Sequence, residues 1–285
     1  MKFVSRLVVS SRPISWVNTA FPFAATYFFL DGDINFFFWV TSLFFFIPYN
    51  LLMYGINDVF DYESDLRNPR KGGIEGGLLP PEFHAATLWT SIALSVPFVV
   101  FIAAASWGNA LALTAFLGTL FFVVAYSVKG LRFKEIPFLD SMTSSIHFVG
   151  PALFAVALLG GFSREIFIAL AAFFLWGAAS HAFGAVQDIR ADREAGIASI
   201  ATVLGARTTV RMAMAIYFVA AVILTLLPGR FSFAALAAIP YLFVVGRSYA
   251  ITDETCEQAN RGWKLFMGLN FLAGAIVTSL LIGPV

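Results

Sequence analysis

Long apolar stretches with few or no formal charges dominate this chain and restrict its fold more than any other feature. Nine of them are long enough to cross a bilayer, which takes about 20 apolar residues in a helix. Because lipid offers the backbone no hydrogen-bond partner, each crossing is expected to be an α-helix. The predicted fold class is an all-α, polytopic membrane protein with nine transmembrane helices, near residues 13–30, 36–57, 86–107, 109–127, 139–160, 164–187, 208–228, 231–251 and 263–283.

The composition supports this assignment and limits the partners. Charged residues make up 12% of the 285 residues, against about a quarter in soluble domains. The net charge of +1 argues against a nucleic-acid partner, which favours a basic excess. A single cysteine, Cys256, excludes an internal disulfide. No linker interrupts the chain, so we expect one domain over 1–285, with residues 1–12 as an interfacial lead-in.

The distribution of lysine and arginine predicts the orientation. If the N-terminus is cytoplasmic, sixteen of the eighteen Lys and Arg residues fall on the cytoplasmic side, and only Arg164 and Arg230 fall outside. Such a split follows the positive-inside rule. We therefore expect a multi-pass protein of the cell membrane with its C-terminus outside.

Two acidic motifs lie at the predicted cytoplasmic ends of apolar stretches. The first motif comprises Asn57, Asp58, Asp61 and Asp65, and the second motif comprises Asp188 and Asp192. Carboxylates near hydrocarbon are costly and usually mark a functional site. The alternative is a set of solvated carboxylates at helix ends.

Helical spacing groups the polar residues of each motif on one face. Asn57, Asp61 and Asp65 are spaced by four, Asp58 is rotated by about 100° from Asn57, and Asn50 and Tyr54 continue the stripe. Asp188 and Asp192 are also four apart. His181 lies on the same stripe, and the small residues Gly184 and Ala185 between them are expected to leave room for a ligand.

Carboxylate and amide oxygens suit Mg²⁺, or Mn²⁺ in its place. Facing motifs could hold a diphosphate through bridging metal ions, with Asn57, Asp61, Asp188 and Asp192 as the predicted ligands. Nearby cations could grip phosphate oxygens. The candidates are Arg67, Lys71, Arg132 and Lys134; an ordinary positive-inside excess is the alternative for each.

At these residues the chain resembles the UbiA superfamily of intramembrane prenyltransferases. The first motif matches the pattern N-D-x-x-D-x-x-x-D, and the second matches D-x-x-x-D followed by a glycine, Gly196. Further matches are Arg12-Pro13, the stretch from Tyr126 to Lys134, Pro137 and Asp140. Gln187 departs from the asparagine of many members, and Ser199 stands where threonine is common. Within the superfamily the chain is most similar to lycopene elongases, through the stretches 11–19, 54–65, 68–73 and 256–261.

This resemblance implies a helical bundle around a central cavity, Mg²⁺ dependence, dimethylallyl diphosphate as donor and lycopene as acceptor, reached from the membrane lipid. One or both acceptor ends are extended, with or without hydroxylation. Asp58 and Asp65 would complete or orient the metal shell beside Asp61, Asp188 and Asp192.

The remaining candidates each have an alternative. Tyr54 and Tyr126 would shield an allylic cation, or belong to an interfacial aromatic belt. His181 or the departing diphosphate would take a proton, and a hydrogen-bonded cavity role is favoured for His181. Asn18 contacts substrate or bridges helices.

Two other functions stay open from the sequence. One is a member of the same superfamily with an aromatic or other lipid acceptor. The other is a secondary transporter, whose carboxylates usually lie at the midplane on broken helices. Here the motifs are expected at the ends of unbroken spans.

Overall fold

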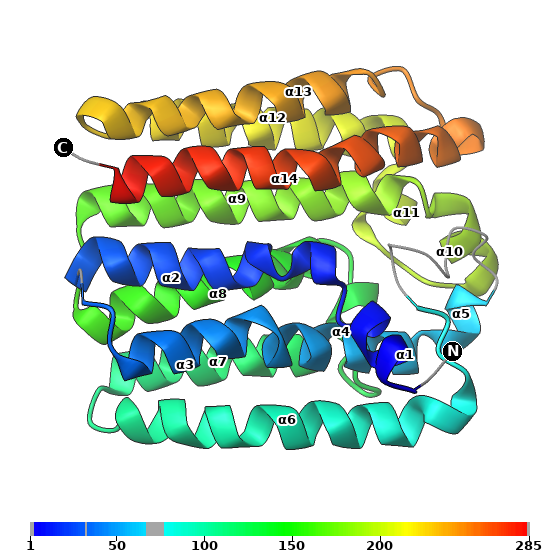
Figure 1. Ribbon diagram of the computed structural model, residues 1–285. Coiled ribbons are helices and arrows are strands. Elements are labelled where there is room, and N and C mark those ends of the chain that lie inside the picture. Colours follow the sequence, from blue (N-terminus) through cyan, green and yellow to red (C-terminus); the bar gives the residue numbers. More distant parts are fainter. Residues whose placement is uncertain (1–2, 32, 67–76, 284–285) are drawn as a thin grey trace. The chain divides into compact units, whose positions relative to one another are not determined.

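A computed structural model describes residues 3–31, 33–66 and 77–283, without the side chains of residues 31 and 64. Regular structure in these ranges is entirely helical (Figure 1). The chain divides into two compact units, Met1–Arg132 with Gly150–Gly160, and Phe133–Val149 with Gly161–Val285. Helix α8 (Leu139–Leu159) contributes its first half to the second unit and its second half to the first.

Within the described residues, eight helical stretches are long and apolar enough to cross a membrane. They are Phe36–Phe60, Pro81–Ala105, Ala110–Ser127, Leu139–Leu159, Arg164–Val186, Ala206–Leu224, Gly229–Gly246 and Asp253–Ile282. The predicted span 13–30 is a shorter apolar helix, Val17–Leu30. The molecule is an integral membrane protein by these helices, and the count of nine crossings stays a prediction.

The first unit is a group of helices packed around α4. Contacts join α4 to α1, α3, α6 and α7, and α2 packs on α3. Its elements are α1 (Phe3–Ser10), η1 (Pro13–Ser15), α2 (Val17–Asp31), α3 (Phe36–Phe46), α4 (Pro48–Phe60), α5 (Tyr62–Asp65), η2 (Pro81–Phe83), α6 (His84–Ala105) and α7 (Ala110–Ser127).

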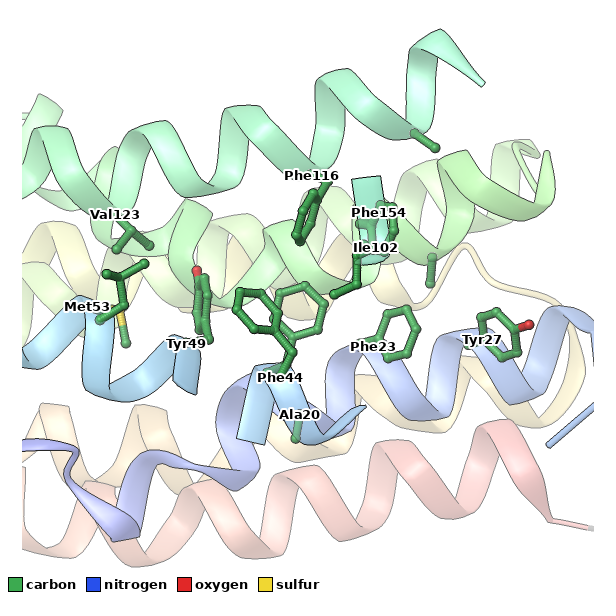
Figure 2. Packing of buried hydrophobic residues seen from close by; sticks show 14 of the residues in the cluster. Ala20, Phe23, Tyr27, Phe44, Tyr49, Met53, Ile102, Phe116, Val123 and Phe154 are labelled. Atoms are coloured by element: carbon green, nitrogen blue, oxygen red, sulfur yellow. The ribbon is translucent and has the colours of Figure 1, made fainter. Parts of the chain in front are cut away.

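Aromatic rings fill the core of the first unit. Phe23, Phe44, Phe116 and Phe154 are fully buried, and Figure 2 shows them meeting between helices that lie far apart in sequence. Phe116 and Phe154 have ring centroids 5.1 Å apart, within the usual range for aromatic pairs. The phenylalanine content therefore builds helix packing in this unit as well as lipid-facing surface.

The span predicted over 36–57 is present as Phe36–Phe60, but the expectation that it is unbroken is wrong, because α3 ends at Phe46 and α4 begins at Pro48. Pro48 occupies the first position of α4, where its missing N–H leaves no bond unmade. Asn50 Nδ2 donates hydrogen bonds to the backbone carbonyls of Phe45 and Phe46, at 3.0 and 3.1 Å. Thr19 Oγ1 donates a further hydrogen bond to Phe45 O at 2.7 Å. These side chains satisfy backbone groups that lipid could not.

The second unit packs α9 against α12, with α13 and α14 completing the group. Its further elements are η3 (Phe133–Glu135), α9 (Arg164–Val186), α10 (Ile189–Ala195), α11 (Ile200–Leu204), α12 (Ala206–Leu224), η4 (Gly229–Ala237), α13 (Ala238–Gly246), η5 (Asp253–Gln258) and α14 (Ala259–Ile282). The predicted span 231–251 is a 3₁₀ stretch followed by a short α-helix.

Candidate active site

The first motif lies where α4 ends and α5 begins. Asn57 and Asp58 are on the last turn of α4, Asp61 follows its end, and Asp65 closes α5. The i to i+4 bonding continues, with Asp61 N on Asn57 O at 2.9 Å and Asp65 N on Asp61 O at 2.8 Å. The predicted helical spacing therefore holds, with only a turn at Asp61. Asp61 and Asp65 are 8% and 7% exposed, so both carboxylates are buried within their unit.

Asp58 is held by the N-terminal segment. Arg12 Nη2 donates to Asp58 Oδ1 at 2.8 Å, and Ser10 Oγ donates to Asp58 Oδ2 at 2.8 Å. The Asp58 side chain has no exposed surface and that of Arg12 is 14% exposed, so this ion pair is buried. The structure thus gives Asp58 a contact that ties the end of α1 to α4, on a different side of α4 from Asn57, as the predicted rotation requires.

The other side of the motif meets the end of α7. Ser127 Oγ donates to Asn57 Oδ1 at 3.0 Å. Arg132 approaches the motif with Nη1 3.4 Å from Phe60 O and Nη2 3.7 Å from Asp61 Oδ1. Arg132 is therefore beside a predicted metal ligand, as expected for a cation that neutralises diphosphate there.

Both arginines of this unit that contact the motif adopt a left-handed backbone. Arg12 has φ +50° and Arg132 has φ +42°, and Phe138 is the third non-glycine residue with positive φ in the described part of the chain. Such conformations cost of order 1–3 kcal/mol for ordinary residues and cluster at functional sites. The backbone is thus bent where each guanidinium must turn toward an aspartate.

The remaining predicted residues of this unit have contacts of their own. The Arg12 guanidinium lies 4.2 Å over the Tyr54 ring, and Tyr54 OH is 2.9 Å from Ser15 Oγ. One face of Tyr54 is therefore occupied by a protein cation. Asn50 is fully buried at the α3–α4 break, Asn18 is half-buried on α2, and Tyr126 precedes Ser127 on the last turn of α7.

The second motif repeats the local geometry of the first. Asp188 follows the end of α9 with φ −99° and ψ −4°, and Asp61 follows α4 with φ −99° and ψ −2°. Asp192 N bonds Asp188 O at 2.8 Å, the same length as the bond from Asp65 N to Asp61 O. In each unit, one turn in the chain places two carboxylates one helical turn apart.

A buried network of hydrogen bonds lies in the same unit as the second motif and is centred on Asp140. Asp140 is fully buried, and its carboxylate accepts from Ser141 N at 2.6 Å and from Ile200 N at 2.7 Å. Ser141 Oγ lies 3.0 Å from His181 Nδ1. His181 is thus a half-buried, hydrogen-bonded residue, as favoured for it. Asp140 fixes the start of α11, which follows the second motif.

The prediction that Gly184 leaves room for a ligand is wrong. A Cβ placed on Gly184 would lie 2.9 Å from the Trp263 ring, so an indole fills the space. The absence of a side chain at Gly184 allows α14 to pack closely against α9.

Some predicted residues do not enter this geometry. Arg67 and Lys71 lie outside the described residues, and Lys134 lies half-buried in η3. Over the described ranges, no three His, Cys, Asp or Glu side chains form a group able to hold a metal ion. The predicted ligands, Asn57 and Asp61 in the first motif and Asp188 and Asp192 in the second, fit Mg²⁺, which usually binds through one or two carboxylates plus substrate phosphates and waters.

Comparison with known families identifies the chain. The sequence model of the UbiA prenyltransferase family matches residues 19–272. The chain belongs to the UbiA prenyltransferase family. The family resemblance seen in the sequence is therefore confirmed.

Sequence similarity to known proteins covers nearly the whole chain. A lycopene elongase/hydratase of Corynebacterium glutamicum is 50% identical over 284 residues, covering 99% of this chain and 98% of that protein. A lycopene elongase/hydratase of Halobacterium salinarum is 33% identical, covering 85% of this chain and 90% of that protein. A solved UbiA homologue from Archaeoglobus fulgidus, bound to dimethylallyl diphosphate (DMAPP) and Mg²⁺, has TM-score 0.69 at 17% identity. It covers 95% of this chain and 99% of that protein, which shows the UbiA fold.

Sequence reasoning about this UbiA protein missed several residues around the motifs. Ser10, Ser127 and Asn260 are separated from their partners by 48, 70 and 73 positions, so no local spacing pointed to them. Arg12, Ser127 and Asn260 do fall in stretches that carried the family resemblance, and this was the available signal.

Proposed function

We propose that this chain transfers a dimethylallyl group from dimethylallyl diphosphate to an end of lycopene, as a lycopene elongase with or without hydration. The observation that carries the proposal is the 50% identity to a lycopene elongase/hydratase over nearly the full length of both chains. The two acidic motifs supply the polar chemistry this reaction needs, and the aromatic-rich apolar helices suit a hydrocarbon acceptor.

The proposal assigns Mg²⁺ to Asn57, Asp61, Asp188 and Asp192, with Asp65 orienting the shell. When bound, Mg²⁺ neutralises the leaving diphosphate. Asp58 acts by positioning, because its carboxylate is held by Arg12 and Ser10. Arg132 and Lys134, with Arg67 and Lys71, are proposed to bind diphosphate oxygens.

The chemistry then proceeds on the substrates. The allylic C–O bond breaks and the diphosphate takes its electron pair. The terminal double bond of the polyene donates its electrons to the allylic carbon, which forms the new C–C bond and leaves a tertiary cation. That cation loses a proton to His181 or to diphosphate, or it is captured by water with release of a proton.

The proposal also fixes the location. Both motifs lie on the cytoplasmic side of the cell membrane, with nine crossings, the N-terminus inside and the C-terminus outside. The asymmetry of Lys and Arg supports this arrangement.

Expression in a lycopene-producing host tests the function. We expect new carotenoids with one or two added five-carbon units, detected by chromatography and mass spectrometry. Asp61→Ala and Asp188→Ala should each lower their yield by at least 100-fold, because a metal ligand is lost. The matched controls are Glu63→Ala and Glu194→Ala, exposed carboxylates on α5 and α10, which should keep the yield within about twofold.

An assay of the purified enzyme with different acceptors distinguishes the candidate reactions. Release of diphosphate that requires Mg²⁺ and lycopene supports the proposal. Transfer to an aromatic acceptor in place of lycopene would assign the chain a different reaction within the family. Full activity of Asp61→Ala or Asp188→Ala would remove the metal assignment.

A further inference from the structure

The segment formed by η5 and the start of α14 runs antiparallel to the second motif and contacts the chain on both sides of Asp188. Beyond Asp188, Arg193 Nη1 lies 2.7 Å from Asp253 Oδ2 and Arg190 Nη1 lies 3.4 Å from Glu257 Oε1. Before Asp188, Asn260 Nδ2 donates to Gln187 Oε1 at 2.7 Å. Residues 187, 190 and 193 thus meet 260, 257 and 253 in a steady antiparallel register.

One more step of this register reaches Gly184. Trp263 covers Gly184, one turn before Gln187 on α9 and one turn after Asn260 on α14. A Cβ on Gly262 would in turn lie 3.0 Å from the Phe183 ring. The two helices are therefore closely packed at this level, and the position of Asn260 relative to α9 is fixed by bulk on both sides.

The side chains that form these contacts between α9–α10 and η5–α14 differ in their exposure to water. Arg190 and Glu257 have side chains 54% and 67% exposed, and such pairs contribute little. Gln187 is 5% exposed, so its amide is out of reach of most water. An unmade hydrogen bond at a buried amide is costly, and the Asn260–Gln187 bond is the contact in this register with the greatest consequence for the motif.

The Gln187 side chain, which accepts from Asn260, also donates a hydrogen bond to the backbone just before Asp188. Its Nε2 donates to Gly184 O at 2.8 Å, while Asp188 N turns to Ala185 O at 3.1 Å. The Gln187 side chain therefore satisfies a backbone carbonyl at the C-terminal end of α9. Both ends of this amide are engaged, one by α14 and one by the last turn of α9.

The turn held in this way is the turn that presents Asp188. Asp188 leaves α9 at φ −99° and ψ −4°, and Asp192 N bonds back to Asp188 O. A change in the turn would alter the direction of both carboxylates together, because α10 follows it directly.

We propose that Asn260 is a positioning residue for the second motif, which acts through Gln187 to set the affinity of Asp188 and Asp192 for the divalent ion. This inference rests on the metal assignment of the proposed function. Partners that orient metal ligands typically change metal affinity by about 10–100-fold when removed.

Metal binding tests the inference without turnover. Mn²⁺ is titrated into purified protein holding the unreactive donor analogue dimethylallyl S-thiolodiphosphate, and free Mn²⁺ is followed by electron paramagnetic resonance. Asn260→Ala and Gln187→Ala are each expected to raise the Mn²⁺ dissociation constant by about tenfold. The double variant is expected to match the single ones, because both changes remove the same contact.

Asn270→Ala is the matched control. Asn270 is the same residue type on the same helix, it accepts from Tyr241 OH at 2.9 Å, and it lies ten positions from Asn260. Its loss should leave the dissociation constant within twofold. Asn260→Leu, which keeps the branched shape and the number of heavy atoms of the side chain, should behave as Asn260→Ala and serves if the alanine variant does not purify.

Three results would overturn the inference: wild-type Mn²⁺ affinity in Asn260→Ala or Asn260→Leu, effects of the two single changes that multiply in the double variant, or an equal shift in Asn270→Ala. Wild-type protein that binds Mn²⁺ with the analogue but transfers no prenyl group would refute the proposed function instead. The variant comparison would still decide the role of Asn260.

Discussion

At the scale of single residues, a distant arginine forms an ion pair with the buried carboxylate of Asp58. Arg12 lies 46 positions away and reaches Asp58 from a left-handed backbone. Removing one partner of a buried ion pair usually costs 3–5 kcal/mol, because the other charge is left buried and uncompensated. The pair therefore matters for the stability of the N-terminal segment on α4 as well as for the direction of the first motif.

Arg12→Ala is accordingly expected to destabilise the protein by about 3 kcal/mol. The double variant Arg12→Ala/Asp58→Asn should regain a large part of this loss, since an amide carries no charge and Ser10 Oγ can still donate to its oxygen. Denaturant unfolding in detergent measures both. Equal destabilisation of the single and double variants would show that the charge of Asp58 is not what Arg12 balances.

Asp140 links the residue scale to the elements. Both of its carboxylate oxygens accept backbone N–H groups, one from its own helix and one from the first residue of α11. Asp140→Asn turns one acceptor into a donor facing an N–H group. We expect a loss of about 1–3 kcal/mol of unfolding free energy and faster amide exchange over 200–204.

Ser199→Ala provides the comparison for that change. Ser199 Oγ accepts from Thr202 N in the capping box of the same helix. Its removal should cost about 1 kcal/mol, the usual effect of a lost N-cap. If Asp140→Asn is as stable as the wild type, the carboxylate does not hold α11.

Helix packing gives a prediction that separates two glycines on neighbouring helices. A Cβ on Gly150 of α8 would overlap the Thr119 side chain of α7, whereas a Cβ on Gly118 of α7 meets nothing within 4 Å. Gly150→Ala should therefore destabilise by about 1–3 kcal/mol through overpacking. Gly118→Ala should be neutral or stabilise by up to about 1 kcal/mol, because alanine favours a helix.

Thermal unfolding in detergent, with both variants measured side by side, checks this pair. A Gly150→Ala protein as stable as Gly118→Ala would mean that α7 and α8 are not packed at this level. The comparison is internal, since both changes add one methyl group to a helix of the first unit.

At the scale of the whole molecule, the sequence predicted the elements better than their interruptions. Apolar length alone predicted the eight helical stretches that are long enough to cross a membrane in the described part of the chain, because a membrane helix needs little else. The break at Ile47–Pro48 was missed although Pro48 signals it, since the carbonyls it frees are met by Thr19 and Asn50 from afar.

The motifs show the same division. Spacing along one helix predicted that Asn57, Asp61 and Asp65 share a face, and that Asp58 is rotated by about 100° from Asn57 while lying near Asp61 and Asp65. It could not supply Arg12, Ser127 or Trp263, because these residues meet the motifs only through packing between helices. The ligand space expected at Gly184 failed for that reason: a small residue fits a ligand or a neighbouring ring equally well, and only the fold decides.

The proposed metal assignment requires that both motifs lie on one side of the membrane, and labelling can test this. Cys256 is the single cysteine and is buried, so Cys256→Ala gives a background without reactive thiols. Single cysteines at Glu63 and Glu194, exposed beside the two motifs, should react with a membrane-impermeant maleimide only after the cells are permeabilised.

Cysteines at Trp107 and Phe162, exposed in the connections after α6 and α8, should react in intact cells. This pattern follows from the excess of Lys and Arg on the predicted cytoplasmic side. A uniform reversal of all four positions would correct the orientation and leave the paired site intact. Opposite behaviour of positions 63 and 194 would place the two motifs on different sides of the bilayer, where no ion or diphosphate could bridge them.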